Sequence, residues 1–162
     1  MKFDSDLLLT YKRLLQTTEL EKSYQEFVRL FRYLRIELEK QLTDCKFQGA
    51  VVENAMDYSY FQFTNGSLKK KGLKLAVAFV HRDFRFEVWL SGFNRKYQSR
   101  YFELLKNKQQ PFSLTDDPKR TDYILRILLD TNMDLSDGER VLAEVSAAAL
   151  ELLGYAERVE AA

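Results

Sequence analysis

Hydrophobic positions in the first quarter of the chain recur at helical spacing. They predict a first helix over residues 5–16, with an apolar face made of Leu7, Tyr11, Leu14 and Leu15. Thr18 lies three residues before Glu21, which is a capping-box pattern. Apolar residues then follow at steps of three and four. They predict a long amphipathic helix over about residues 18–42, with an apolar face wide enough for burial on more than one side.

From residue 47 onward the hydrophobic pattern has the period of β-strands. Four segments are rich in β-branched and aromatic residues, and turn-forming residues separate them. We predict strands over residues 47–52, 59–64, 73–81 and 84–92. Because the connections between them are short, the four strands favour an antiparallel meander over parallel crossovers.

The second half of the chain returns to helical spacing, with one ambiguous segment. Residues 94–108 predict a helix, and a capping-box pattern at Ser136 and Glu139 predicts a last helix that ends near residue 159. Residues 122–130 fit either a strand or a fully buried helix, and we favour the strand. The predicted fold is α+β: a four- or five-stranded, mostly antiparallel sheet with helices packed on one face.

Strand register can be predicted for the hairpin over residues 73–92. If Arg82 and Asp83 form a two-residue turn, facing residues have numbers that sum to 165, and facing side chains share a face of the sheet. One face is then wholly apolar. A shift by one residue would bring Glu87 onto that face, and burying an unpaired carboxylate costs several kcal/mol (about 3 or more). The unshifted register is therefore predicted.

The opposite sheet face collects a mixed set of side chains around the small residues Ala76 and Ala78. The set consists of Tyr60, Gln62, Arg85, Glu87 and Trp89. Two interpretations are open. The face can be plainly solvated, with Arg85 paired to Glu87 and Lys74 as a flanking solubilising charge. Alternatively it can be a shallow binding site for a protein partner or a small ligand, because exposed aromatic side chains such as Trp89 cluster at interaction sites. We adopt the non-enzymatic binding module as the first hypothesis.

Clustered cations suggest an alternative, a nucleic-acid-associated or nucleic-acid-processing protein. The cations are Lys69, Lys70, Lys71, Arg95, Lys96 and Arg100, and aromatic residues lie between them in the sequence. The formal net charge of only +1 argues against a general attraction to polyanions. Binding that weakens steeply with salt would distinguish this alternative from an aromatic groove.

Other site chemistry has weak support in the sequence. His81 is the only histidine, and an enzyme that uses Glu87 with His81 is the least favoured hypothesis. Residues 130–141 resemble a calcium loop, but Leu135 stands where the loop needs glycine and Val141 where it needs glutamate. With a single cysteine and no glycine-rich phosphate loop, we predict no metal, no cofactor and no disulfide within the chain.

Composition and length fit a soluble protein. The chain has 162 residues, with 46% hydrophobic and 30% charged residues, and the length favours one domain over residues 1–162. The N-terminus does not resemble a signal peptide, and no apolar run approaches the ~20 residues of a membrane helix. We expect a cytoplasmic location, no membrane contact, and a possible homodimer through the sheet face or a sheet edge.

Three segments resemble a known family. They are YFQFT (60–64), LKLAVAFVH (73–81) and RFEVWLSGFNRKYQSRYFELL (85–105). They are similar to an uncharacterised bacterial family, a domain of unknown function, over most of residues 10–140. The resemblance implies a cytosolic α+β protein and supplies no activity, cofactor or catalytic residue. A fainter similarity of the FEVWL strand and the helix after it to small domains of restriction-type proteins favours the nucleic-acid alternative.

Overall fold

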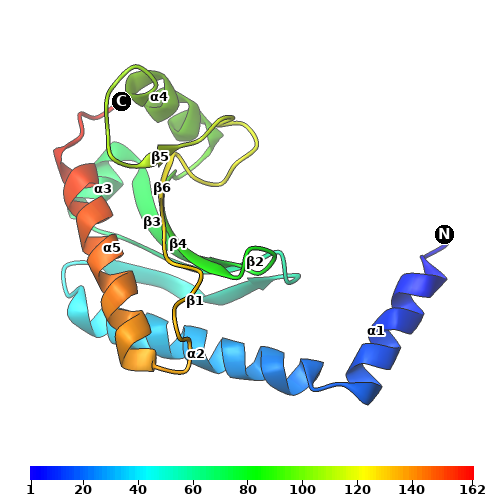
Figure 1. Cartoon of the computed structure of the whole chain (residues 1–162). Helices are drawn as coiled ribbons and strands as arrows, with labels where there is room; N and C mark the ends of the chain where they lie inside the picture. The colour runs from blue at the N-terminus through cyan, green and yellow to red at the C-terminus, as the bar shows by residue number, and fades with distance from the viewer.

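The computed structural model describes residues 1–162 and contains helices around one curved sheet (Figure 1). The helices are α1 (Ser5–Thr17), α2 (Leu20–Gln41), α3 (Gly66–Lys71), α4 (Arg95–Leu105) and α5 (Gly138–Arg158). The strands are β1 (Lys46–Asn54), β2 (Tyr58–Thr64), β3 (Leu73–Val80), β4 (Arg85–Gly92), β5 (Ser113–Leu114) and β6 (Leu125–Leu128). The predicted α+β class is confirmed.

The sheet has six antiparallel strands in the order β1-β2-β3-β4-β6-β5. The predicted meander is β1 to β4. Residues 122–130 do contain a strand, β6, which pairs with the outer side of β4. The sixth strand, β5, is only two residues long and carries no alternating pattern that sequence analysis could detect.

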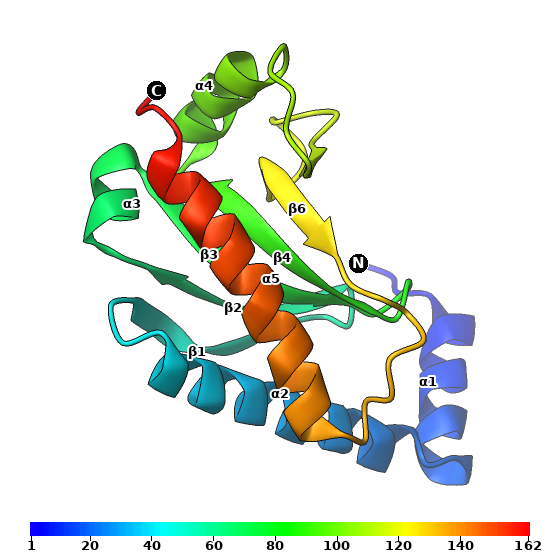
Figure 2. The ribbon, with the colours of Figure 1, turned by 60° about the vertical axis from the view of Figure 1, so that its left-hand side comes forward.

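The predicted hairpin register is confirmed. Val80 faces Arg85 and Val77 faces Val88, so all facing pairs of β3 and β4 sum to 165. The apolar face lies under α2 and α5, and α5 crosses it diagonally (Figure 2). The core between these layers is rich in fully buried phenylalanine, including Phe31, Phe61 and Phe79. Sorting of alternate side chains therefore decides which face of the sheet the helices cover.

Three details of the helices differ from the predictions. First, α2 buries one stripe rather than several sides, because Val28, Phe31, Leu34 and Leu38 are its only buried residues. Second, neither predicted capping box forms: α2 has no side-chain cap, and α5 is capped by Asp137, whose carboxylate accepts from the Arg140 N–H. Third, Lys69, Lys70 and Lys71 lie in α3, a helix that the sequence pattern does not predict. Separately, none of the helices is both long and apolar enough to cross a membrane.

Helix α1 stands away from the rest of the molecule (Figure 1). None of its 13 residues is buried, and α2 supplies its main tertiary contact. The remaining helices border the sheet: α2 and α5 cover the apolar face, and α4 packs at the end of β4. The opposite face of β2, β3 and β4 is left without a covering helix, and it carries the candidate site.

Candidate functional site

A hollow of about 440 Å³ lies on the uncovered sheet face. Its floor is formed by β2, β3 and β4, and its rim by the start of α4 and the loop before β6. Tyr60, Gln62 and Trp89 line this hollow, as the predicted face requires. Arg85 and Glu87 share the face but do not line it. We call the hollow the sheet pocket.

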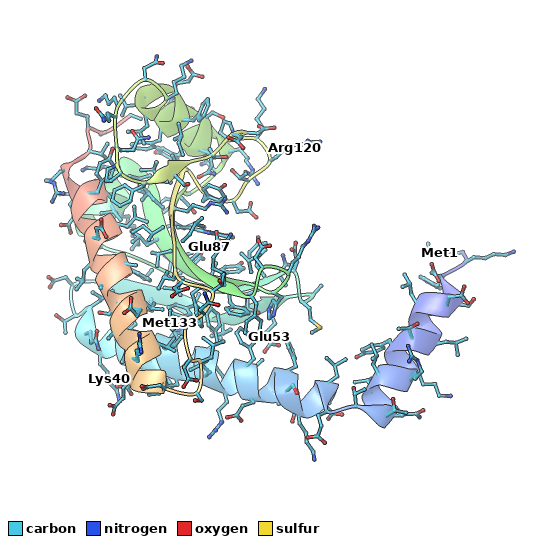
Figure 3. All side chains as sticks on the ribbon, in the orientation of Figure 1. Met1, Lys40, Glu53, Glu87, Arg120 and Met133 are labelled. Atoms are coloured by element: carbon cyan, nitrogen blue, oxygen red, sulfur yellow. The ribbon has the colours of Figure 1, made fainter.

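Glu87 is the centre of an ion network beside the sheet pocket, on the side of the sheet away from α5 (Figure 3). Its side chain is 0% exposed. One carboxylate oxygen accepts from Arg85 Nη2 at 2.8 Å, and the other accepts from Arg126 Nη1 at 2.9 Å and from Trp89 Nε1 at 3.0 Å. The predicted Arg85 partner is correct, but Glu87 is neither solvated nor open to a ligand, because β6 supplies a second cation above it.

Trp89 is buried, contrary to the predicted exposure. Only 7% of it is accessible, because Tyr58 and Tyr123 flank its ring at centroid distances of 5.1 and 5.7 Å. Ala76 and Ala78 lie beneath it in a second, smaller apolar cluster. The predicted small-against-large packing is therefore present. The large side chain fills part of the concavity and leaves one edge of its ring to the sheet pocket.

Lys74 lies on the floor of the sheet pocket, opposite Ser91 of β4. It is half-buried, and its ammonium group forms no hydrogen bond or ion pair within the chain. Desolvation lowers the pKa of Lys74, and the nearby Asp122 carboxylate opposes that shift. The predicted strand register correctly placed Lys74 on this face. Its environment does not fit a solubilising surface charge, because the protein partly desolvates the cation and leaves it unpaired.

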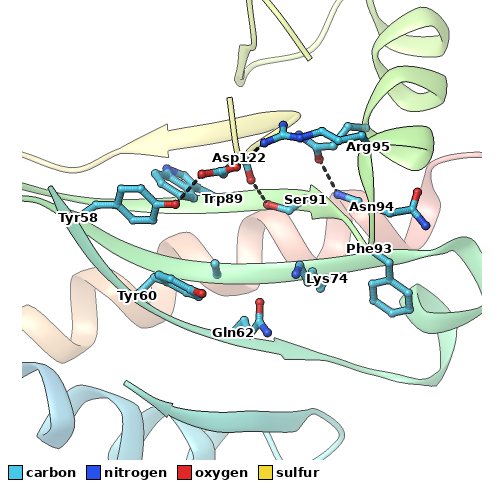
Figure 4. A pocket seen from close by; sticks show the side chains of 13 residues that line it. Tyr58, Tyr60, Gln62, Lys74, Trp89, Ser91, Phe93, Asn94, Arg95 and Asp122 are labelled. Carbon is cyan, nitrogen blue, oxygen red and sulfur yellow. Dashed lines mark hydrogen bonds and ion pairs between the residues drawn. The ribbon is translucent and has the colours of Figure 1, made fainter. Parts of the chain in front are cut away.

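Asp122 reaches the rim of the sheet pocket from the loop before β6 and is held there by three contacts (Figure 4). Its carboxylate accepts from Arg95 Nη2 at 2.7 Å and from the Tyr58 hydroxyl at 2.5 Å. Its backbone carbonyl accepts from the Ser91 hydroxyl at 2.6 Å. Burial and the hydrogen bond to Asp122 raise the pKa of Tyr58, so that the phenol remains a donor. The rim is therefore a fixed polar wall.

The lining residues that sequence analysis missed as site residues include Tyr58, Lys74, Ser91 and Asp122. Three of them share the strand parity of Tyr60 and Trp89, so alternation alone could have added them. Asp122 could not be found in this way, because it arrives from a loop far along the chain. Across the molecule, no cluster of three or more His, Cys, Asp or Glu side chains is close enough to hold a metal ion.

His81 and Glu87 do not form a joint site. His81 lies on the helix-covered side, where its ring packs against Phe27 and Phe79 and its Nε2 is 2.9 Å from Ser59 Oγ. Glu87 points to the opposite face. The least favoured hypothesis, an enzyme that uses both residues together, is therefore inconsistent with the geometry. His81 is partly exposed, as expected for its place beside the turn.

The packing of His81 predicts a pH effect on stability. Desolvation lowers the pKa of His81 below its ordinary 6.5, while Asp57 acts weakly in the other direction. The unfolded chain then binds the proton more readily, so stability present above pH 6.5 is lost as pH falls through the folded-state pKa. We expect His81→Phe to reduce this pH dependence of the free energy of unfolding, by less than about 1.4 kcal/mol per pH unit. Urea denaturation at a series of pH values between 7.5 and 5 measures the change. If the free energy of unfolding of the variant fell with pH as steeply as that of the wild type, groups other than His81 would be the cause of the pH dependence.

Two of the six cations predicted for nucleic acid are engaged within the chain. Lys71 Nζ donates to the carbonyls of Ala156, Glu157 and Val159 and so caps the end of α5. Arg95 donates to Asp122 and to carbonyls of the same loop. Lys69, Lys70, Lys96 and Arg100 are exposed on α3 and α4. The arrangement gives Lys71 and Arg95 structural roles and leaves the nucleic-acid interface a prediction.

A family model described as Domain of unknown function (DUF7000) matches residues 4–159. No curated protein and no solved structure is significantly similar to the chain. The predicted resemblance to an uncharacterised domain family is confirmed, and the bacterial origin stays a prediction.

Proposed function

The chain belongs to the DUF7000 family, whose description assigns no activity, and we propose from its geometry that it is a binding module for a small anionic ligand with a flat apolar part. The sheet pocket is the proposed site. The observation that carries the proposal is Lys74, whose half-buried side chain lies on the floor of the pocket and whose ammonium group has no partner within the chain.

Charge favours an anion at this position. The ionised side chains that line the sheet pocket are Lys74, Arg95 and Asp122, and Arg95 already pairs with Asp122 at 2.7 Å. The lining therefore has one positive charge in excess. A partly desolvated cation without a partner is costly, and an anionic group placed beside it recovers that cost through a charge-assisted hydrogen bond. A carboxylate or phosphate of the ligand is the matching group.

The remaining walls fit a flat, partly apolar moiety. Tyr60 and Trp89 supply aromatic surface, and Gln62 supplies an amide that both donates and accepts. Ligand pockets are commonly lined in this way, with apolar walls and a few placed polar groups. The ion network of Glu87 holds Trp89 through its indole N–H, so the aromatic wall is oriented before a ligand enters.

Trp89 is the only tryptophan, so its fluorescence reports on the sheet pocket directly. We expect benzoate and phenyl phosphate to change the emission of the intact chain in a saturable way, and benzyl alcohol to have a much smaller effect. Lys74→Met keeps the length of the apolar stem and removes the charge. It should raise the dissociation constant of the anionic probes by about tenfold or more, which corresponds to about 1.4 kcal/mol.

Lys70→Met is the matched control, because Lys70 is exposed on α3 and does not line the sheet pocket. It should leave the titration unchanged. Equal binding of the charged and neutral probes, or a Lys74→Met variant that binds like the wild type, would contradict the proposal.

The nucleic-acid alternative is tested in parallel with a single-stranded oligonucleotide at about 50 and about 200 mM salt, because phosphate binding weakens steeply over this range.

A further inference from the structure

Helix α1 presents an apolar stripe that nothing in its own chain covers. Leu7, Leu8 and Tyr11 are 67%, 58% and 57% exposed and lie at helical spacing on one side of the helix. A helix of 13 residues is marginal in water unless a tertiary contact buries its apolar face. An uncovered stripe on so short a helix indicates a contact with another molecule.

A partly apolar hollow of about 680 Å³ lies between α2, the β3–β4 turn and the start of α5. Phe27, Leu30, Tyr33, Phe84 and Leu135 supply its apolar lining. Phe84 belongs to the β3–β4 turn and is held in the left-handed region with φ of 48°, which keeps its ring 59% exposed beside the helix. We call this the α2 hollow. It is separate from the sheet pocket, since the two share no residue.

The bend between α1 and α2 holds α1 away from the α2 hollow of its own chain. The Thr18 N–H and hydroxyl both donate to the Leu14 carbonyl, and the Leu20 N–H donates to the Thr18 hydroxyl oxygen at 3.3 Å. The bond from Leu20 to Thr18 spans the bend, and folding α1 back onto its own α2 would break it. The bend therefore places α1 where it can contact a neighbouring molecule rather than the α2 of its own chain.

Charges along the two helices match in an antiparallel arrangement. The start of α1 is acidic, with Asp4 and Asp6, and the middle of the helix is basic, with Lys12 and Arg13. The start of α2 has a net negative charge from Glu19, Glu21 and Lys22, and the turns with Glu26, Arg29 and Arg32 have a net positive charge. An α1 that runs antiparallel to α2 places opposite charges together at both ends. Both helices are present in every copy, so a second copy of this chain supplies a complementary partner.

We propose that the chain forms a two-fold dimer in which α1 of each copy lies antiparallel on α2 of the other copy. Leu7, Leu8 and Tyr11 enter the partner's α2 hollow. The same contact occurs twice in a two-fold pair, which doubles the apolar surface removed from water. The interface uses neither the sheet face nor a sheet edge, and the sheet pocket stays open in both copies.

Sedimentation equilibrium of the full chain tests the proposal. We expect twice the monomer mass of 19.1 kDa at micromolar concentrations. The double variant Leu7→Glu, Leu8→Glu should raise the dimer dissociation constant at least a hundredfold, and it should not disturb the fold of one copy because both residues are exposed. Leu150→Glu is the matched control, an exposed leucine of α5 outside the α2 hollow, and it should leave the dimer intact.

Cross-linking identifies which α1 fills the α2 hollow. In a Cys45→Ser background, Leu8→Cys combined with Leu30→Cys should give a covalent dimer on oxidation. A wild-type chain that stays monomeric at about 100 μM, or a dimer that survives Leu7→Glu, Leu8→Glu, would overturn the proposal. A cross-link that forms within one chain would overturn it too, by showing that α1 folds back onto its own α2.

Discussion

Replacing Glu87 with alanine is expected to lower the free energy of unfolding by about 3–5 kcal/mol, the usual cost of breaking a buried ion pair from one side. The carboxylate is fully buried and holds Arg85, Arg126 and the Trp89 indole. Without it, two guanidinium groups with side chains only 20% and 27% exposed are left facing each other across the same site. Urea denaturation followed by far-UV circular dichroism measures the change.

Glu103→Ala provides the comparison for Glu87→Ala. Glu103 pairs with Lys106 on the surface of α4, and exposed pairs of this kind contribute about 0–1 kcal/mol. Glu87→Gln should fall between the two variants, because the amide oxygen can still accept from Trp89 while the charge is lost. If Glu87→Ala cost no more than Glu103→Ala, the network would not be part of what stabilises the fold.

Replacing Gly92 with alanine is expected to cost about 1–3 kcal/mol and to disturb the sheet pocket. A methyl group there would lie 2.7 Å from the Gln98 backbone nitrogen and 2.8 Å from Tyr97 Cβ. These atoms belong to the first turns of α4 and cannot rotate away. The same residue also donates its N–H to Gln98 Oε1 at 2.6 Å. We therefore expect α4 to shift outward and to carry Arg95 with it.

Gly66→Ala is the matched control for Gly92→Ala. Gly66 begins α3, and a methyl group added there meets no atom within 4 Å. We expect a neutral or slightly stabilising effect of up to about 1 kcal/mol, because alanine restricts the unfolded chain. Thermal unfolding of both variants, with probe titration of Trp89 fluorescence, separates the outcomes. If Gly92→Ala and Gly66→Ala had equal melting temperatures, α4 would not pack against β4 as closely as described.

Much of the sheet could be predicted because the cost of a wrong register is large. Moving Glu87 onto the apolar face would bury a charge, and this penalty fixed the pairing of β3 with β4 from sequence alone. The start of α3 was also detectable in principle. Asn65 caps this helix by accepting from the Leu68 N–H, and Gly72 ends it with φ of 73°. From the sequence, Asn65 is predicted only as part of a turn between two strands, and Gly72 carries no prediction.

Burial on the second sheet face could not be predicted in the same way. Alternation assigns a side chain to a face but does not say what covers that face. Arg126 and Tyr123, which cover Glu87 and Trp89, come from a segment with one short strand and no strong periodicity. The sheet pocket depends on the same segment through Asp122. Its depth and charge therefore depend on tertiary contacts between distant parts of the chain.

The placement of Arg126 has a consequence for how the chain assembles. The hairpin of β3 and β4 can form from neighbouring sequence, whereas β6 must close a long loop before it pairs with β4. The native alignment, with Arg126 opposite Trp89, brings the guanidinium to the carboxylate of Glu87. If β6 paired with β4 one residue out of register, the buried carboxylate of Glu87 would keep Arg85 but lose Arg126, one of its two cationic partners. The same ion pair thus acts as a check on correct closure of the sheet during folding.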